Sequence, residues 1–390
     1  MSGIGRRIWG MLAMLACLTG MTAAQAETAG EPVVMRIYAP ETAIGEQTAQ
    51  RLTRLLGSAM PQGEWTLVRE GDLRALVLAD DAPQLAICGP GEAMPWAREG
   101  LLMPLDGQIA DTARMQQQVL TPCTYAGHLF MAPLLARHRQ MAVNRQLLER
   151  SQFGYLLDPL AHPVWLPSEL QQVLEEFALR DQPAMDIWPA LGEGGEAIEA
   201  LVQAIYGGAL LSEDGQTVTA DTGELRSGLS WLADMVQGGL IGWAEDRETA
   251  LARFLRGETA LFVGWTDEDA SRVRQGKPEL ALLPYPSALG VPVRSYELTG
   301  LCAFATGDSA QRALAMQAAA LLSEDARAQL ALGSRAVFQD DAFWLPCLEA
   351  DTRGATLRSL FGAAIDAAVA GERTPKAALS IVQAAMDAAE

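Results

Sequence analysis

The stretch from Ile205 to Ile241 constrains the fold most, because it marks the end of one helix and both ends of the next. Paired glycines at positions 207 and 208 predict the first end, since glycine adopts the left-handed C-cap conformation without steric cost. We expect the second helix to begin at Asp221 or Thr222, with Glu224 completing a capping box. Its apolar residues recur at helical spacing, at Leu225, Leu229, Leu232 and Val236. This helix therefore has one face suited to a protein core.

The N-terminal part of the chain alternates β-rich runs with helical segments. We expect strands at 33–38, 65–68 and 85–88, with helices near 45–56 and 72–78 between them. Further along, Ser168 and Thr374 are expected to cap helices, the second followed by a proline at the tolerated first position. This alternation predicts an α/β sheet covered by helices.

The N-terminus has the pattern of an export signal. Two arginines precede an apolar run from Ile8 to about Met21, and Ala24-Gln25-Ala26 supplies the small-x-small cleavage site. We therefore expect a periplasmic protein cleaved after Ala26 and exported by the general secretory route. The residues around the arginines fit the twin-arginine route poorly. Lipid anchoring at Cys17 ranks behind free secretion, because the residues before this cysteine suit that signal badly.

Size and charge narrow the class of protein. The chain without its signal is too long for one typical hydrophobic core, so two domains are expected. A formal net charge of −19 argues against nucleic acid or an anionic membrane as a partner. Beyond the signal, no apolar run approaches the ~20 residues of a membrane-spanning helix.

Four cysteines follow the signal, at Cys88, Cys123, Cys302 and Cys347. In an oxidising compartment, an even number allows up to two disulfides in three possible pairings. Their spacing is too wide for a zinc motif. Structural bridges and buried thiols both remain open at this point.

Two further stretches of sequence are informative together with the one at 205–241. They are APQLAICGPGEAMPWAREGLLMPLD at 82–106 and TYAGHLFMAPLLARHRQMAVNRQLLE at 124–149. In their joint order, the three resemble the extracellular solute-binding proteins of ABC importers, in the family that includes maltose-binding protein. The chain differs from the residues that are common in this family at Gln84, Arg137 and Val143.

The resemblance implies a two-lobed α/β fold, with a mixed sheet flanked by helices in each lobe and hinge crossings between them. The first lobe is expected to span 31–136 plus 288–335, and the second 137–287 plus 336–390. The lobes would close around one small-molecule solute and deliver it to the ABC permease subunits of the inner membrane. The resemblance also implies that the protein needs no cofactor and no metal and that it is a monomer.

Trp265 and Arg137 are the first candidates for ligand contact. Trp265 follows the expected strand at 260–264, where many family members stack a tryptophan on a sugar ring. The alternative is a tryptophan that packs within the lobe. Arg137 lies at the lobe crossing, and its planar guanidinium suits carboxylate, phosphate or vicinal hydroxyls. The alternative is an ion pair at the hinge.

Four more residues are weaker candidates: Glu41, Glu92, Trp188 and Tyr296. Both carboxylates follow expected strands, and side chains beyond the carboxyl ends of strands often line the ligand crevice. Acids at helix starts are also favoured by the helix dipole, which is the structural alternative. Trp188 precedes a glycine-rich turn, and Tyr296 lies near the second lobe crossing.

Enzymatic signals are sparse. The three histidines form no metal-binding pattern, and no nucleophile-elbow motif occurs. The stretch 192–197, GEGGEA, formally matches a dinucleotide fingerprint, but its two glutamates would repel a pyrophosphate. We expect a binding protein for a sugar, oligosaccharide or polyol. The alternatives are an anionic solute held by Arg137, a secreted carbohydrate-active enzyme, and a binding protein that serves a chemoreceptor or sensor.

Overall fold

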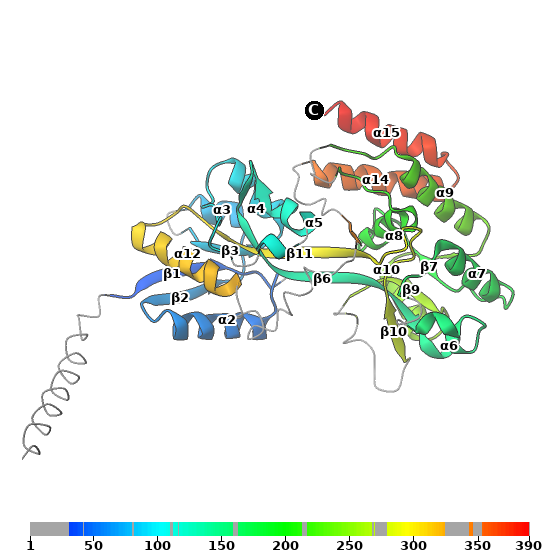
Figure 1. Cartoon of the computed structure of the whole chain (residues 1–390), viewed down its shortest axis with the longest axis horizontal. Helices are drawn as coiled ribbons and strands as arrows, with labels where there is room; N and C mark the ends of the chain where they lie inside the picture. The colour runs from blue at the N-terminus through cyan, green and yellow to red at the C-terminus, as the bar shows by residue number, and fades with distance from the viewer. Residues whose placement is uncertain are drawn as a thin grey trace, which may run out of the picture.

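The computed structural model describes residues 31–389, apart from 42, 80–81, 110–111, 116, 159–162, 213–216, 267–268, 270–278, 324–342 and 346–352. Within this part of the chain, the buried apolar side chains form two separate hydrophobic cores. The first core draws on residues 35–136 and 296–322, and the second on 141–293 and 345–386. Figure 1 shows the two halves of the molecule side by side, with long strands passing between them.

Three parallel strands form the centre of the first half: β1 (Val33–Tyr38), β2 (Gly63–Val68) and β3 (Leu85–Cys88). The strand β1 pairs with both of the others. Helices accompany them: α2 (Glu46–Ala59), α3 (Leu73–Val77), α4 (Pro90–Arg98) and α12 (Ser309–Ser323). The predicted alternation of strand and helix is confirmed in this half.

Shorter elements lead from the first half to the crossing: η1 (Thr112–Arg114), α5 (Gln117–Leu120), η2 (Thr121–Cys123), β4 (Thr124–Tyr125) and β5 (His128–Leu129).

Two long antiparallel strands connect the cores, β6 (Met131–Asn144) and β11 (Val293–Ala303). The first residues of β6, such as Met131, lie in the first core, and its later residues, such as Met141, lie in the second. The strand β11 runs the opposite way, with Val293 in the second core and Leu301 in the first. The sheet order is β10-β6-β11-β3-β1-β2, with β9 also on β6 and β12 on β11. Both cores therefore share one hydrogen-bonded sheet of mixed direction.

The second half is richer in helices. Its helical elements are α6 (Arg145–Glu149), η3 (Gly154–Leu157), α7 (Pro167–Ala178), α8 (Glu196–Tyr206), α9 (Gly223–Gln237), α10 (Arg247–Leu255), α14 (Gly354–Val369) and α15 (Pro375–Asp387). Its strands are β7 (Asp186–Ile187), β8 (Gly242–Trp243), β9 (Leu261–Trp265), β10 (Leu280–Leu283) and β12 (Phe343–Trp344). Helix α8 packs against α9, and α14 contacts α8, α9 and α15.

The two helices predicted at 205–241 are present. Helix α8 ends at Gly207, whose φ of 73° is left-handed. The hydroxyl of Thr222 caps α9 by accepting a hydrogen bond from the Leu225 amide at 3.4 Å. With Thr222 as the cap, Glu224 takes the second helical position, so the predicted capping box is wrong. Helices α8 and α9 approach closely, because a Cβ on Gly228 would lie 2.1 Å from the carbonyl oxygen of Val202.

One predicted cap is confirmed and one is wrong. The hydroxyl of Thr374 accepts from the Ala377 amide at 3.3 Å and begins α15. Helix α7 begins at Pro167, one residue before the predicted cap, because proline fits the first helical position and lacks an amide hydrogen. The carboxylate of Glu169 then accepts from the Leu166 amide at 2.8 Å. Ser168 is therefore inside the first turn.

The cysteines within the described part of the chain are buried free thiols, at Cys88, Cys123 and Cys302. The sulfur atoms of Cys88 on β3 and Cys302 on β11 lie 3.8 Å apart. The hydrogen bond with the Cys302 thiol, followed by burial, raises the pKa of Cys88 well above its ordinary value. Cys347 lies outside the described residues. None of the described helices combines the length and apolarity needed to cross a bilayer.

Candidate functional site

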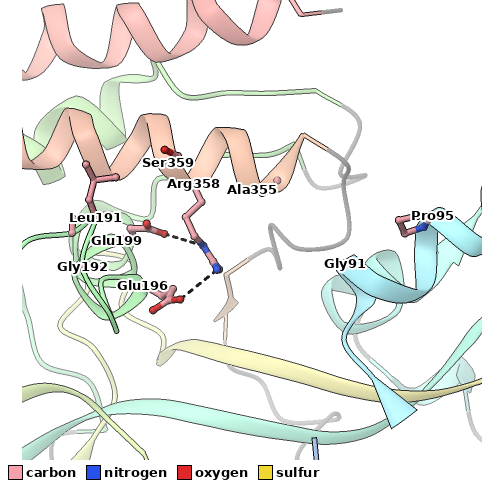
Figure 2. A pocket seen from close by; sticks show the side chains of 11 residues that line it. Gly91, Pro95, Leu191, Gly192, Glu196, Glu199, Ala355, Arg358 and Ser359 are labelled. Carbon is pink, nitrogen blue, oxygen red and sulfur yellow. Dashed lines mark hydrogen bonds and ion pairs between the residues drawn. The ribbon is translucent and has the colours of Figure 1, made fainter. Parts of the chain in front are cut away.

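A cavity of roughly 610 Å³ lies between α4 of the first half and helices α8 and α14 of the second. Gly91 and Pro95 line it from α4, whose buried face belongs to the first core. The opposite lining comes from the loop before α8, from α8 itself and from the start of α14, all next to the second core. Figure 2 shows the two sides facing each other. The cavity therefore lies between the two cores.

The first side of the cavity is built by the end of β3. This strand stops at Cys88, and Pro90 begins α4 at a position that needs no amide hydrogen. The carboxylate of Glu92 accepts a hydrogen bond from the Gly89 amide at 3.3 Å. These contacts hold the first turn of α4, with Gly91, at the edge of the cavity.

The second side is built by a glycine-rich loop tied to α14. Both carboxylate oxygens of Asp366 accept backbone hydrogen bonds, from Ala190 at 2.7 Å and from Leu191 at 3.2 Å. The loop is tight, because a Cβ on Gly195 would lie 1.9 Å from the carbonyl oxygen of Ala190. Gly194 has a φ of 73°, a conformation that side-chain-bearing residues rarely adopt.

This loop is the GEGGEA stretch that formally matched a dinucleotide fingerprint. The strand before it, β7, has two residues and pairs with the equally short β8. A dinucleotide site needs the glycines between a central parallel strand and its helix, within a βαβ unit. The stretch instead forms the turn into α8 and one wall of the cavity.

Three charged side chains on this wall form a cluster (Figure 2). The Arg358 guanidinium on α14 lies 3.4 Å from Glu196 and 3.7 Å from Glu199, both on α8. The Glu199 side chain is 4% exposed, whereas those of Glu196 and Arg358 are 28% and 30% exposed. Burial raises the pKa of Glu199 to about 7, although the nearby Arg358 lowers it. The cluster therefore offers donors and acceptors to a solute, with one carboxyl that titrates near neutrality.

The two candidate tryptophans lie in the second core rather than in the lining of this cavity. Trp265 ends β9, is 3% exposed, and packs edge-on against Phe254 and Phe262 at 6.1 and 6.3 Å between ring centroids. Trp188 is 1% exposed and stacks on Phe262 at 5.6 Å. Phe262 thus brings the two tryptophans into one aromatic cluster. Stacking of either one on a ligand stays a prediction.

Arg137 and Tyr296 lie on the connecting strands. The Arg137 guanidinium is 3.5 Å from the Glu297 carboxylate on β11, and it donates to the carbonyl oxygen of Ala43 at 3.0 Å. The ion pair that was the alternative to ligand contact is therefore present at the crossing. Tyr296 pairs with His138 on β6 and is largely buried in the first core.

The two candidate carboxylates outside the cluster, Glu41 and Glu92, are both exposed. Glu41 lies in the turn after β1, and Glu92 lies beside Gly91 at the cavity. The structure thus brings one of the six sequence candidates next to the cavity. Sequence reasoning missed the cluster of Glu196, Glu199 and Arg358. The one signal in the sequence is the spacing of Glu196 and Glu199, which places both carboxylates in the first turn of a helix.

Comparisons with known proteins identify the family. A model of bacterial extracellular solute-binding proteins matches residues 70–337. A search of curated proteins finds no significant match.

Solved structures match in fold. The sugar-binding protein MalE from the phytopathogen Xanthomonas citri is 15% identical, with a TM-score of 0.73 over 91% of this chain and 96% of that one. The substrate-binding protein Lmo0181 from Listeria monocytogenes, in complex with cycloalternan, is 13% identical, with a TM-score of 0.67 over 92% and 99%. The acarbose-binding GacH receptor of Streptomyces glaucescens is 15% identical, with a TM-score of 0.62 over 91% and 97%.

The expected two-lobed α/β fold is therefore confirmed, and the family match covers most of the chain. The family consists of solute-binding proteins of the ABC-transporter type and is not catalytic. This protein belongs to the bacterial extracellular solute-binding protein family.

Proposed function

We propose that this protein captures a sugar, an oligosaccharide or a sugar-like polyol between its lobes and delivers it to an ABC permease. The observation that carries the proposal is the cavity between α4 and the helices α8 and α14, since its walls belong to the two different cores. A solute that contacts both walls favours the closed arrangement, because it binds that arrangement more tightly than the open one.

The proposed lobes are residues 31–136 plus 288–335 and residues 137–287 plus 336–390. The positions of the cores support the first boundary, because β6 leaves the first core after Ala136 and enters the second at Met141. On β11 the change between cores comes later than residue 288, because Val293 still lies in the second core and Tyr296 lies in the first. In this arrangement β6 and β11 are the hinge. The ion pair between Arg137 and Glu297 lies across these strands at that point.

The class of solute is supported by the lining and by the similar structures. The Glu196 carboxylate can accept a hydrogen bond from a sugar hydroxyl, and the Arg358 guanidinium can donate one to a hydroxyl oxygen. Hydrogen bonds to charged groups such as these are the stronger ones. Two of the similar proteins form complexes with acarbose and with cycloalternan, respectively. An export signal cleaved after Ala26 would place the protein in the periplasm, where a permease can receive the solute.

Native mass spectrometry of the purified protein tests the proposal. We expect a bound saccharide or polyol that is released unchanged on denaturation, and loss of its uptake by cells that lack the gene. Recovery of a hydrolysed sugar would favour an enzyme. Unchanged uptake in the deletion strain would contradict delivery to a permease.

A further inference from the structure

The cavity wall contains a buried carboxyl whose ionisation changes the charge of the site. Glu199 lies behind Glu196 and Arg358, and 3% of its surface is exposed. Among the described residues that line the cavity, these three are the charged ones. Two carboxylates and one guanidinium give the wall a net charge of −1. With Glu199 protonated, the remaining pair of Glu196 and Arg358 is neutral.

Charged groups on three elements act on Glu199. Arg358 on α14 and Arg139 on β6 favour its ionised form, whereas Glu196 on α8 and Asp366 on α14 oppose it. Burial has the largest effect, acts in the same direction as the two carboxylates, outweighs the two guanidiniums and raises the pKa of Glu199 to about 7. Near neutral pH, a small change in pH or in the surroundings of the carboxyl therefore changes its protonation state.

Entry of a solute deepens the burial of this cluster. A molecule that fills the cavity displaces water from Glu196 and Arg358, and closure of the lobes displaces more. A net charge without water is costly, whereas a compensated ion pair is tolerated when its hydrogen bonds are satisfied. Solute binding should therefore favour the neutral cluster, in which Glu199 carries a proton.

We propose that the solute is a neutral, hydroxyl-bearing molecule and that its binding is coupled to protonation of Glu199. Glu196 and Arg358 then face the solute as a compensated acceptor and donor, with Glu199 as the positioning residue behind them. This inference rests on the proposed function, because it assumes that the solute occupies this cavity.

The charge of the solute follows from the same balance. An anionic solute would face Glu196, and the charge of Arg358 is already offset by two carboxylates. A cationic solute would be attracted by the ionised cluster, so its binding would release a proton rather than take one up. The direction of proton transfer therefore distinguishes the classes.

Isothermal titration calorimetry of the full mature protein tests the coupling. The probes are maltose and maltotriose as neutral saccharides, with glucosamine and glucuronate as charged ones. We expect a neutral saccharide to bind best, with proton uptake at pH 7.5 seen as a heat that differs between phosphate and Tris buffers. Above pH 7, its affinity should fall by up to about tenfold per pH unit, the limit for uptake of one proton.

Two variants separate this coupling from a structural effect. Glu199→Gln resembles the protonated side chain, so it should bind at pH 8.5 as tightly as the wild type at pH 6, with no proton uptake. Glu224→Gln removes an exposed carboxylate from α9 and should retain the wild-type pH dependence. The number of protons taken up on binding is measured on the wild type alone. The coupling can therefore be tested even if Glu199→Gln does not fold.

The outcomes are distinct. Binding of a neutral saccharide without proton uptake overturns the role of Glu199 and leaves the proposed function intact. Tightest binding of glucosamine or glucuronate overturns the neutral class. If none of the probes binds at any pH and native mass spectrometry finds no bound saccharide or polyol, the proposed function fails and this inference fails with it.

Discussion

The replacement Glu199→Gln should make the protein more stable at alkaline pH, without any ligand. Burial raises the pKa of this carboxyl from 4.5 to about 7 in the folded protein. In the unfolded chain the pKa returns to this ordinary value of 4.5. Between these values the folded protein holds a proton that the unfolded chain has released, so the free energy of unfolding falls as pH rises.

The size of the effect follows from the two pKa values. Each unit of difference corresponds to about 1.4 kcal/mol, so ionisation of Glu199 lowers the free energy of unfolding by about 3 kcal/mol. The loss begins above about pH 4 and is complete by about pH 8. The attraction of Arg358 is already contained in the folded-state pKa, so it is not deducted again.

Denaturant unfolding at several pH values between 5 and 8.5 measures the effect, on the wild type, Glu199→Gln and the exposed control Glu224→Gln. We expect the Glu199 variant to gain on the wild type as pH rises, by about 2.5 kcal/mol over this range, because part of the loss lies below pH 5. The control should run parallel to the wild type. A Glu199 difference that stays constant over this range would refute the argument from burial.

Three further predictions concern the framework of the site. Gly228→Ala should destabilise the protein strongly, because the new Cβ would lie 2.1 Å from the Val202 carbonyl oxygen and force α8 and α9 apart. A melting temperature equal to that of the wild type would contradict this close approach of the two helices. Trp265→Ala should cost about 3–5 kcal/mol of stability because the indole is buried. If the indole also stacks on a sugar, Trp265→Phe should stay folded but lose ligand-dependent thermal stabilisation, and unchanged stabilisation would remove it from the site. Cys88 and Cys302 should react with a thiol reagent after unfolding and not before, whereas silent thiols in the unfolded chain would indicate a disulfide.

Helix ends and caps that depend only on a few consecutive residues could be predicted from the sequence. The helix end at Gly207 and the cap at Thr374 each depend on a few consecutive residues, and both are present. The two errors, the capping box of Glu224 and the cap at Ser168, arose where adjacent residues compete for one role. Thr222 rather than Asp221 caps α9, which moves Glu224 out of reach, and Pro167 displaces the predicted cap of α7.

The charged cluster could not be predicted in this way, because Arg358 lies far along the chain from Glu196 and Glu199. A pair of glutamates in the first turn of a helix has an ordinary explanation in the helix dipole. Their environment depends on how α14 packs against α8, which no local pattern encodes. The strand beside Trp265 was predicted one residue too early, so that Trp265 ends β9 rather than following it. The aromatic cluster that buries Trp265 depends on Phe254 from α10.

The shared strands β6 and β11 have a consequence for the order of synthesis. The first core begins with β1, but it is incomplete without β11 and α12, which follow the long segment 141–293 of the second core in the chain. The pairing of β6 with β11 closes a loop of well over a hundred residues, and such distant contacts form slowly. The N-terminal half therefore cannot finish folding while most of the chain is still being made. Slow completion of the first core is the property that translocation through a narrow membrane channel requires, because such a channel passes only a polypeptide that has not yet folded.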